Sequence, residues 1–183
     1  MQRHTGRPSP DRGIESSRRI EAHQGGAPAE DDRPGHAARR ASARPVIVYL
    51  DSSVVLRPLF AQPGRLRSWG KWTTAYSSEL LGVECRRAID RLRLEGLYDD
   101  AQVARAAQEL IQIERTIRRV RLSRSIIHEA SKAMPTIVKT LDAIHLASAI
   151  LIRERRGIEL LFSTHDTQQA IAARALGFTT LES

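Results

Sequence analysis

One short stretch, residues 46–50, constrains the fold of this chain more than any other. It reads VIVYL, an uninterrupted apolar run, and Asp51, Ser52 and Ser53 follow it directly. Such a run predicts a central strand of a parallel sheet, covered on both faces. Because open α/β sheets keep their ligand sites at the carboxyl ends of strands, Asp51 is a candidate active-site acid. The alternative is that Asp51 only caps the helix that follows, where Asp is a preferred residue.

Composition limits the classes of protein to which the chain can belong. Its 183 residues suffice for one domain with a hydrophobic core, and 41% of them are hydrophobic. No apolar run approaches the ~20 residues that cross a bilayer, and the first residues lack the apolar stretch of a secretory signal. Cys85 is the only cysteine, which excludes an internal disulfide and a cysteine-based zinc site. We therefore expect a soluble, cytoplasmic protein without a membrane partner.

The charge balance is strongly basic, with a formal net charge of +8 at pH 7. A basic protein favours polyanionic partners, because each neutralised phosphate releases condensed counterions. Acidic residues are the minority, so their positions carry information.

Residues 1–44 differ in composition from the remainder. They are rich in Arg, Gly, Pro, Ser, Ala and His, and Ile14 and Ile20 are their only large aliphatic residues. Such a segment cannot bury enough apolar surface to offset chain entropy. We therefore expect a disordered basic N-terminal tail at 1–44 and a folded domain at 45–183. Either the tail helps to bind nucleic acid, or the translation start has been placed too far upstream.

The rest of the chain alternates between short apolar strands and helices. Further strands are expected at residues 72–76, 117–122, 160–163 and 178–181. Helices are expected at 53–60, from a cap at Ser77 and Ser78 to about 94, and at 100–115, 123–133, 140–155 and 167–176. This alternation predicts an α/β fold with a mainly parallel central sheet.

Four acids fall at strand ends or beside apolar helix faces, where charge is least expected: Asp51, Glu84, Asp142 and Asp166. Each has a structural alternative. Asp142 can complement a helix dipole, and Asp166 can cap a helix with Gln169 as its reciprocal partner. Glu84 can pair with Arg87 or Arg91 along its own helix. Because strand ends and helix starts gather at one edge of such a sheet, the four together favour a shared pocket.

Carboxylates that converge in this way require a counter-charge. Two of them ~4 Å apart repel by ~4 kcal/mol at an effective dielectric of about 20. Oxygen ligands without cysteine suit Mg²⁺ or Mn²⁺. An ion held by carboxylates can activate a water molecule and stabilise the charge on a phosphate during in-line displacement.

Four segments, in this order, resemble the PIN domain family. They read YLDSSVV (49–55), SSELLGVE (77–84), TLDAIHLA (140–147) and FSTHD (162–166), and Ala173, Leu176 and Gly177 follow the last. The segment LDAIHLA is the most specific of them. The resemblance covers residues 46–181, and within the family the chain is most similar to the VapC toxins of bacterial toxin–antitoxin pairs.

The resemblance implies a three-layer α/β/α sandwich and a Mg²⁺-dependent endoribonuclease, with Mn²⁺ as an alternative ion. It aligns four residues with the metal-binding catalytic acids of the family: Asp51, Glu84, Asp142 and Asp166. Ser52 or Ser53, and Thr164, match hydroxyl positions that support these acids. Glu79 competes with Glu84 for the second position, and Glu84 is preferred because it follows the helix start by more than a turn. Members of this group act on RNA, commonly form homodimers and are held inactive by a small antitoxin protein.

The alternative from another functional class is a non-catalytic basic module that binds nucleic acid. In such a module all four acids are caps and surface pairs, and loss of Asp51 leaves binding unchanged. His145 and His165 are not expected to be metal ligands, because the carboxylate oxygens already suffice.

Overall fold

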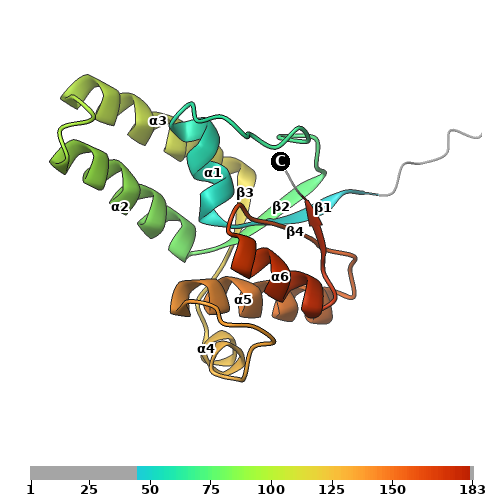
Figure 1. Ribbon diagram of the computed structural model, residues 1–183. Coiled ribbons are helices and arrows are strands. Elements are labelled where there is room, and N and C mark those ends of the chain that lie inside the picture. Colours follow the sequence, from blue (N-terminus) through green and yellow to red (C-terminus); the bar gives the residue numbers. More distant parts are fainter. Residues whose placement is uncertain (1–44, 182–183) are drawn as a thin grey trace, which may run out of the picture. The chain divides into compact units, whose positions relative to one another are not determined.

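The computed structural model describes residues 45–181, which form a five-stranded sheet whose neighbouring strands are all parallel (Figure 1). The strands are β1 (Ile47–Leu50), β2 (Thr74–Ser78), β3 (Ile117–Val120), β4 (Leu161–Ser163) and β5 (Thr179–Leu181). Their order across the sheet is β3-β2-β1-β4-β5. The predicted α/β fold with a mainly parallel sheet is confirmed. The predicted tail at 1–44 lies outside the described residues.

The β1 strand is the centre of the sheet, as its apolar sequence predicts. Successive side chains of a strand point to opposite faces, and in β1 both faces are core. Val48 and Leu50 pack into one hydrophobic cluster, and Tyr49 packs into the other. All three side chains are fully buried, so the sheet is covered on both sides at this strand.

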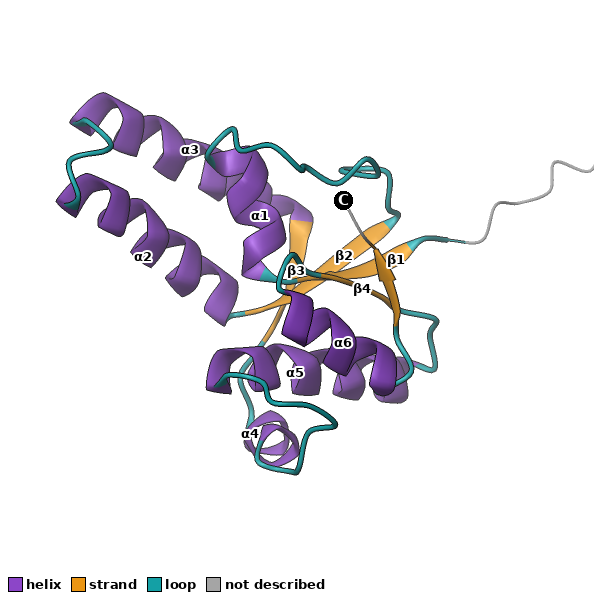
Figure 2. Ribbon diagram, viewed as in Figure 1, coloured by secondary structure: helices purple, strands orange, loops and turns teal. Residues whose placement is uncertain are grey.

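Helices cover both faces of the sheet and give a three-layer α/β/α sandwich, which confirms the fold that the resemblance implies (Figure 2). On the face of Val48 and Leu50 lie α1 (Ser52–Leu59), α2 (Leu80–Leu94) and α3 (Asp100–Thr116). The other face carries α5 (Thr140–Arg156) and α6 (Thr167–Ala175), and α4 (Arg124–Ala130) packs on α5. Among the described residues, no helix has the length and apolarity needed to cross a membrane.

The strand order places a crevice beside β1. From β1 the chain moves outward through β2 and β3, and it then returns to β4 on the other side of β1. At such a switch point the connections after neighbouring strands run in opposite directions, which opens a crevice at the carboxyl ends. Asp51 follows β1 and Asp166 follows β4 by three residues, so both lie at this edge.

The start of α2 differs from the prediction. The β2 strand extends to Ser78, and Ser77 is a buried strand residue whose hydroxyl donates to the carbonyl of Leu50 (2.6 Å). Ser77 is therefore not a helix cap. The helix begins at Leu80, whose N–H donates to the Ser78 hydroxyl (3.2 Å). Two serines before a helix resemble a helix cap in the sequence. The hydrogen-bond acceptor of Ser77, the carbonyl of Leu50, lies on another strand and cannot be seen from local sequence.

Candidate active site

Asp51 lies at the carboxyl end of β1 and is only 5% exposed. Its Oδ2 accepts hydrogen bonds from the backbone N–H of Ser53 (3.0 Å) and from the Ser53 hydroxyl (2.6 Å). The Thr164 hydroxyl, at the end of β4, donates to the same oxygen (3.3 Å). Asp51 is thus the N-cap of α1 and also a buried carboxylate in the crevice. The two interpretations offered for it, helix cap and candidate active-site acid, are therefore compatible.

Gln169, a residue of α6, holds the second oxygen of Asp51. Its Nε2 donates to Oδ1 (3.3 Å), and the side chain is fully buried. Asp166 caps α6 as predicted, since its Oδ1 accepts from the backbone N–H of Gln169 (2.9 Å). The prediction that the Gln169 side chain reciprocates this cap is wrong. Helical spacing reveals only contacts within one element, whereas this contact joins positions 118 residues apart.

Glu84 reaches from α2 to the buried imidazole of His145 on α5. Its Oε2 lies 2.8 Å from Nε2 of His145, and Nδ1 of the same ring lies 3.0 Å from the Tyr49 hydroxyl. The predicted alternative, a pair with Arg87 or Arg91, is not formed; Arg87 binds Asp90 instead (2.9 Å). Glu84 therefore faces the crevice, and the hydrogen bonds run from Glu84 through His145 to Tyr49 in the core.

His145 is fully buried among the candidate acids. Burial lowers the pKa of its imidazole, but the hydrogen bond that Nε2 donates to Glu84 and the charges of Asp51, Glu84 and Asp142 outweigh burial, and the pKa is raised. Nε2 also lies 3.8 Å from Oδ1 of Asp51. Protonated His145 would donate to both Glu84 and Tyr49 and supply positive charge to the acids around it.

Asp142 and Asp166 approach the same edge from the starts of α5 and α6. Burial raises the pKa of Asp142, and the negative charges of Asp51 and Asp166 raise it further. The carboxylate of Asp142 accepts from the backbone N–H of Lys139 (3.3 Å), and Nζ of Lys139 lies 3.8 Å from Oδ2 of Asp166. Repulsion from Asp51 and Asp166 thus adds to the effect of burial on Asp142.

Glu79 is turned away from this group. Its Oε2 accepts from the backbone N–H of Leu122 (3.0 Å), and its Oε1 lies 3.8 Å from Nε of Arg121. These contacts tie the start of α2 to the segment after β3. Of the two glutamates considered for the second position, Glu84 is the one in contact with the buried imidazole.

The donor set suits a hard divalent cation, although the acids do not form a ready-made cage. Within residues 45–181, no group of three or more His, Cys, Asp or Glu side chains is arranged to hold a metal ion. The donors are carboxylate oxygens, the ligands that Mg²⁺ and Mn²⁺ prefer. In the same part of the chain no Lys or Arg lies within ion-pair distance of Asp51, Glu84 or Asp142. Protonated His145 supplies one positive charge to Asp51 and Glu84, so the acids keep an excess of negative charge that fits a bound cation.

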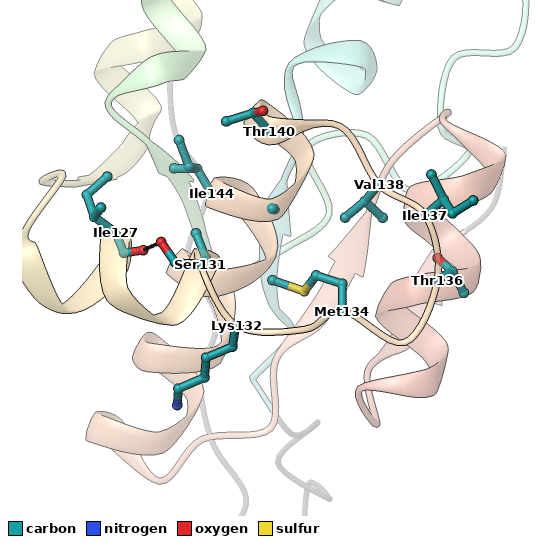
Figure 3. A pocket seen from close by; sticks show the side chains of 11 residues that line it. Ile127, Ser131, Lys132, Met134, Thr136, Ile137, Val138, Thr140 and Ile144 are labelled. Carbon is teal, nitrogen blue, oxygen red and sulfur yellow. Dashed lines mark hydrogen bonds between the residues drawn. The ribbon is translucent and has the colours of Figure 1, made fainter.

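A pocket of about 520 Å³ opens beside this region, between α4 and the start of α5 (Figure 3). Aliphatic side chains dominate its lining, with a few hydroxyls and one lysine: Ile127, Ala130, Ser131, Lys132, Met134, Thr136, Ile137, Val138, Thr140, Ala143 and Ile144. None of the four acids lines it. The largely apolar lining does not suit a metal ion, so the acidic crevice is the candidate active site.

Comparisons with known proteins agree with this fold. The sequence profile of the PIN domain matches residues 48–175. Ribonuclease VapC47 of Mycobacterium tuberculosis is 27% identical over 141 residues, which cover 73% of this chain and 95% of the relative. The crystal structure of VapBC2 from Rickettsia felis, bound to a DNA fragment from its promoter, matches 74% of this chain and 97% of that chain, with a TM-score of 0.52 and 10% identity. A toxin–antitoxin complex from Klebsiella pneumoniae matches 68% and 88%, with a TM-score of 0.49 and 16% identity.

Proposed function

Because the chain belongs to the PIN domain family, we propose that it is a Mg²⁺-dependent endoribonuclease toxin that a cognate antitoxin protein neutralises. The observation that carries the proposal is the environment of Asp51. This buried carboxylate lies at the switch point of the sheet and receives hydrogen bonds from neutral donors only. Among residues 45–181, the cationic group near it is the imidazole of His145, which lies 3.8 Å away and is shared with Glu84. One positive charge does not balance this group of buried and half-buried carboxylates, so their retention points to a ligand of opposite charge.

The residues that would hold the ion come from four separate segments: Asp51, Glu84, Asp142 and Asp166. Mg²⁺ is the expected ion, with Mn²⁺ as the alternative. When bound, such an ion supplies a water molecule activated for attack and neutralises charge that develops on the scissile phosphate.

The protein's own contribution is to fix the carboxylates in place. Ser53 and Thr164 hold one oxygen of Asp51, and Gln169 holds the other. His145 holds the carboxylate of Glu84 through a hydrogen bond from Nε2. Because Gln169 and His145 are fully buried and Thr164 is nearly so, little reorganisation is needed when substrate phosphate arrives.

The partners of this activity follow from the relatives. A named ribonuclease, VapC47, is similar over most of the domain, and VapBC2 shares the fold. We infer an RNA substrate, an antitoxin that covers the acidic crevice, a homodimer and a cytoplasmic location. The basic balance of the chain, +8 in formal charge, suits a polyanionic substrate.

Cleavage of structured RNA tests the proposal. We expect wild-type protein to cut RNA in Mg²⁺ and to stop in EDTA, and we expect Asp51→Asn and Asp142→Asn to lose at least about 100-fold in rate, since each removes a charge from the site. Asp90→Asn is the matched control, because Asp90 lies on α2 in surface ion pairs with Arg87 and Arg93.

The same assay separates the remaining alternatives. Glu84→Gln should abolish cleavage and Glu79→Gln should not, which tests the choice between the two glutamates. If both aspartate variants cleave at the wild-type rate, the proposed site is wrong. If wild-type protein binds RNA in a salt-sensitive manner and never cleaves it, the chain is the non-catalytic binding module instead.

A further inference from the structure

Three arginines gather on the face of the sheet that carries α5, at a distance from the acids. Arg118 comes from β3, and Arg155 and Arg156 come from the last turn of α5. They line a cavity of about 250 Å³ together with Tyr76, Arg119, Val120 and Ile152. All three arginines are exposed, whereas Tyr76 is buried beneath them.

The alternation of β3 explains why Arg118 points to this cavity. Ile117 packs into the cluster of α1, α2 and α3, so the next residue faces the opposite side, where Val120 packs against the α5 cluster. Arg118 is also the direct neighbour of Tyr76 across the sheet. Arg119 also borders the cavity, but the alternation of the strand starts its side chain on the α3 side, where its charge helps to lower the pKa of Glu114.

The three charges lack acidic partners. No Asp or Glu among residues 45–181 lies within ion-pair distance of Arg118, Arg155 or Arg156. The Arg156 guanidinium instead stacks over the ring of Tyr76, 5.5 Å from its centroid. The negative end of the α5 dipole favours arginines in its last turn, but it does not account for Arg118, which a different element adds to the group.

Adjacent guanidinium groups that repel one another and stay exposed form a site for phosphate, which arginine binds through paired N–H donors. We propose that the Arg118–Arg155–Arg156 cluster binds the backbone of the RNA substrate at a point remote from cleavage. This inference rests on the proposed function. Along α5 the cluster lies roughly 20 Å from Asp142, at a rise of 1.5 Å per residue. With a phosphate about every 3.4 Å along a helical strand, roughly six nucleotides bridge that separation.

Binding measured without cleavage tests the cluster directly. Fluorescence anisotropy in EDTA, with labelled single-stranded RNA of roughly sixteen nucleotides, gives Kd as a function of salt. The test variant is Arg118→Gln/Arg155→Gln, which leaves the stacked Arg156 in place. The matched control is Arg105→Gln/Arg115→Gln, which removes the same charge from two exposed arginines of α3. Far-UV circular dichroism checks that both variants are folded.

We expect the test variant to bind more weakly than the control at low salt. Its slope of log Kobs against log salt should be shallower by about 1.4, because each lost phosphate contact on a single strand contributes about 0.7. RNA of roughly two nucleotides cannot reach from the crevice to the cluster even when it is extended, so its binding should be the same in both variants. Where cleavage is observed, KM for the long RNA should rise while kcat stays unchanged.

Equal Kd values and salt slopes for test and control variants would overturn the proposal. So would a loss confined to duplex DNA of equal charge, which would assign the cluster to DNA. Binding in EDTA does not depend on cleavage, so the two proposals can fail separately. If the protein never cleaves RNA but Arg118→Gln/Arg155→Gln weakens RNA binding, the proposed nuclease activity is wrong and the proposed role of the cluster is supported.

Discussion

Gln169 shows how much one buried side chain decides in this site. Its amide is the donor for Oδ1 of Asp51, while its own Oε1 is buried without a hydrogen-bond partner among residues 45–181. The Gln168 side chain beside it in sequence is exposed. A Gln→Glu substitution would therefore place a carboxylate in the buried site at position 169 but in solvent at position 168.

Replacing this donor by an acid should be strongly destabilising. Gln169→Glu places a second carboxylate against Asp51, and we expect a loss of roughly 2–4 kcal/mol in the free energy of unfolding at neutral pH. Gln168→Glu, the matched control, should change stability by less than about 0.5 kcal/mol. Urea unfolding measures both. In acid the difference should shrink, since a protonated carboxyl no longer repels Asp51; a difference that grows in acid would contradict this account.

At the scale of elements, α2 and α3 are joined by a contact that depends on a glycine. Arg86 donates to both carboxylate oxygens of Glu114 (2.9 and 2.7 Å) and to the carbonyl of Gly82 (2.9 Å). A Cβ atom at position 82 would overlap both the Arg86 and Glu114 side chains. The absence of a side chain at Gly82 thus lets the ion pair cross the helix surface.

A double-mutant cycle tests this dependence. Alanine is a better helix former than glycine by about 1 kcal/mol, so Gly82→Ala should stabilise the Glu114→Ala protein by roughly that amount. In the wild type the same change should gain little, because it displaces an ion pair worth about 0.5–1 kcal/mol. Thermal unfolding gives the four values. Equal effects in both backgrounds would show that Gly82 and Glu114 are independent.

At the scale of the whole molecule, the sheet order collects acids from four segments at one edge. The same repulsion between these acids that opposes folding would be relieved by the proposed metal ion. The raised pKa of Asp142 means that its charged form opposes folding in the absence of a cation. The same charge should favour folding when a cation is bound. The stability of the wild type should therefore rise with Mg²⁺, whereas the stability of a neutralised variant should hardly change.

We expect a crossover in melting temperature. In EDTA, Asp142→Asn should be at least as stable as the wild type, since it removes a repelled charge. At Mg²⁺ about 100-fold above Kd, binding adds about 2.7 kcal/mol to the wild type, a rise of roughly 5–10 °C at this chain length, and the variant should hardly shift. Differential scanning calorimetry with Asp90→Asn as control measures this. Equal shifts in wild type and Asp142→Asn would place the ion elsewhere.

The sequence predicted an α/β fold with a mainly parallel sheet because that information is local, and the resemblance implied the three layers. An apolar run marks β1 as central, and helical spacing and glycines mark most element ends; Gly157, for example, ends α5 in a left-handed conformation. Strand ends and helix starts of an α/β fold meet at one edge, so Asp51 and Asp142 could be proposed as neighbours from their positions alone. Glu84 and Asp166 were singled out in the same way, and the resemblance to the PIN domain family, which the matching profile confirms, aligned all four acids with the family's metal-binding positions.

Contacts between distant segments were decided only by the tertiary structure. The sequence by itself determined which residues enter strands, helices and cores, because periodicity and capping act over a few residues. It could not determine that Gln169 turns to Asp51, that Glu84 binds His145, or that Ser77 belongs to a strand. Each of these side chains has a plausible partner nearby in sequence, and packing across the sheet supplies another. Only the folded chain brings those competing partners within hydrogen-bond distance.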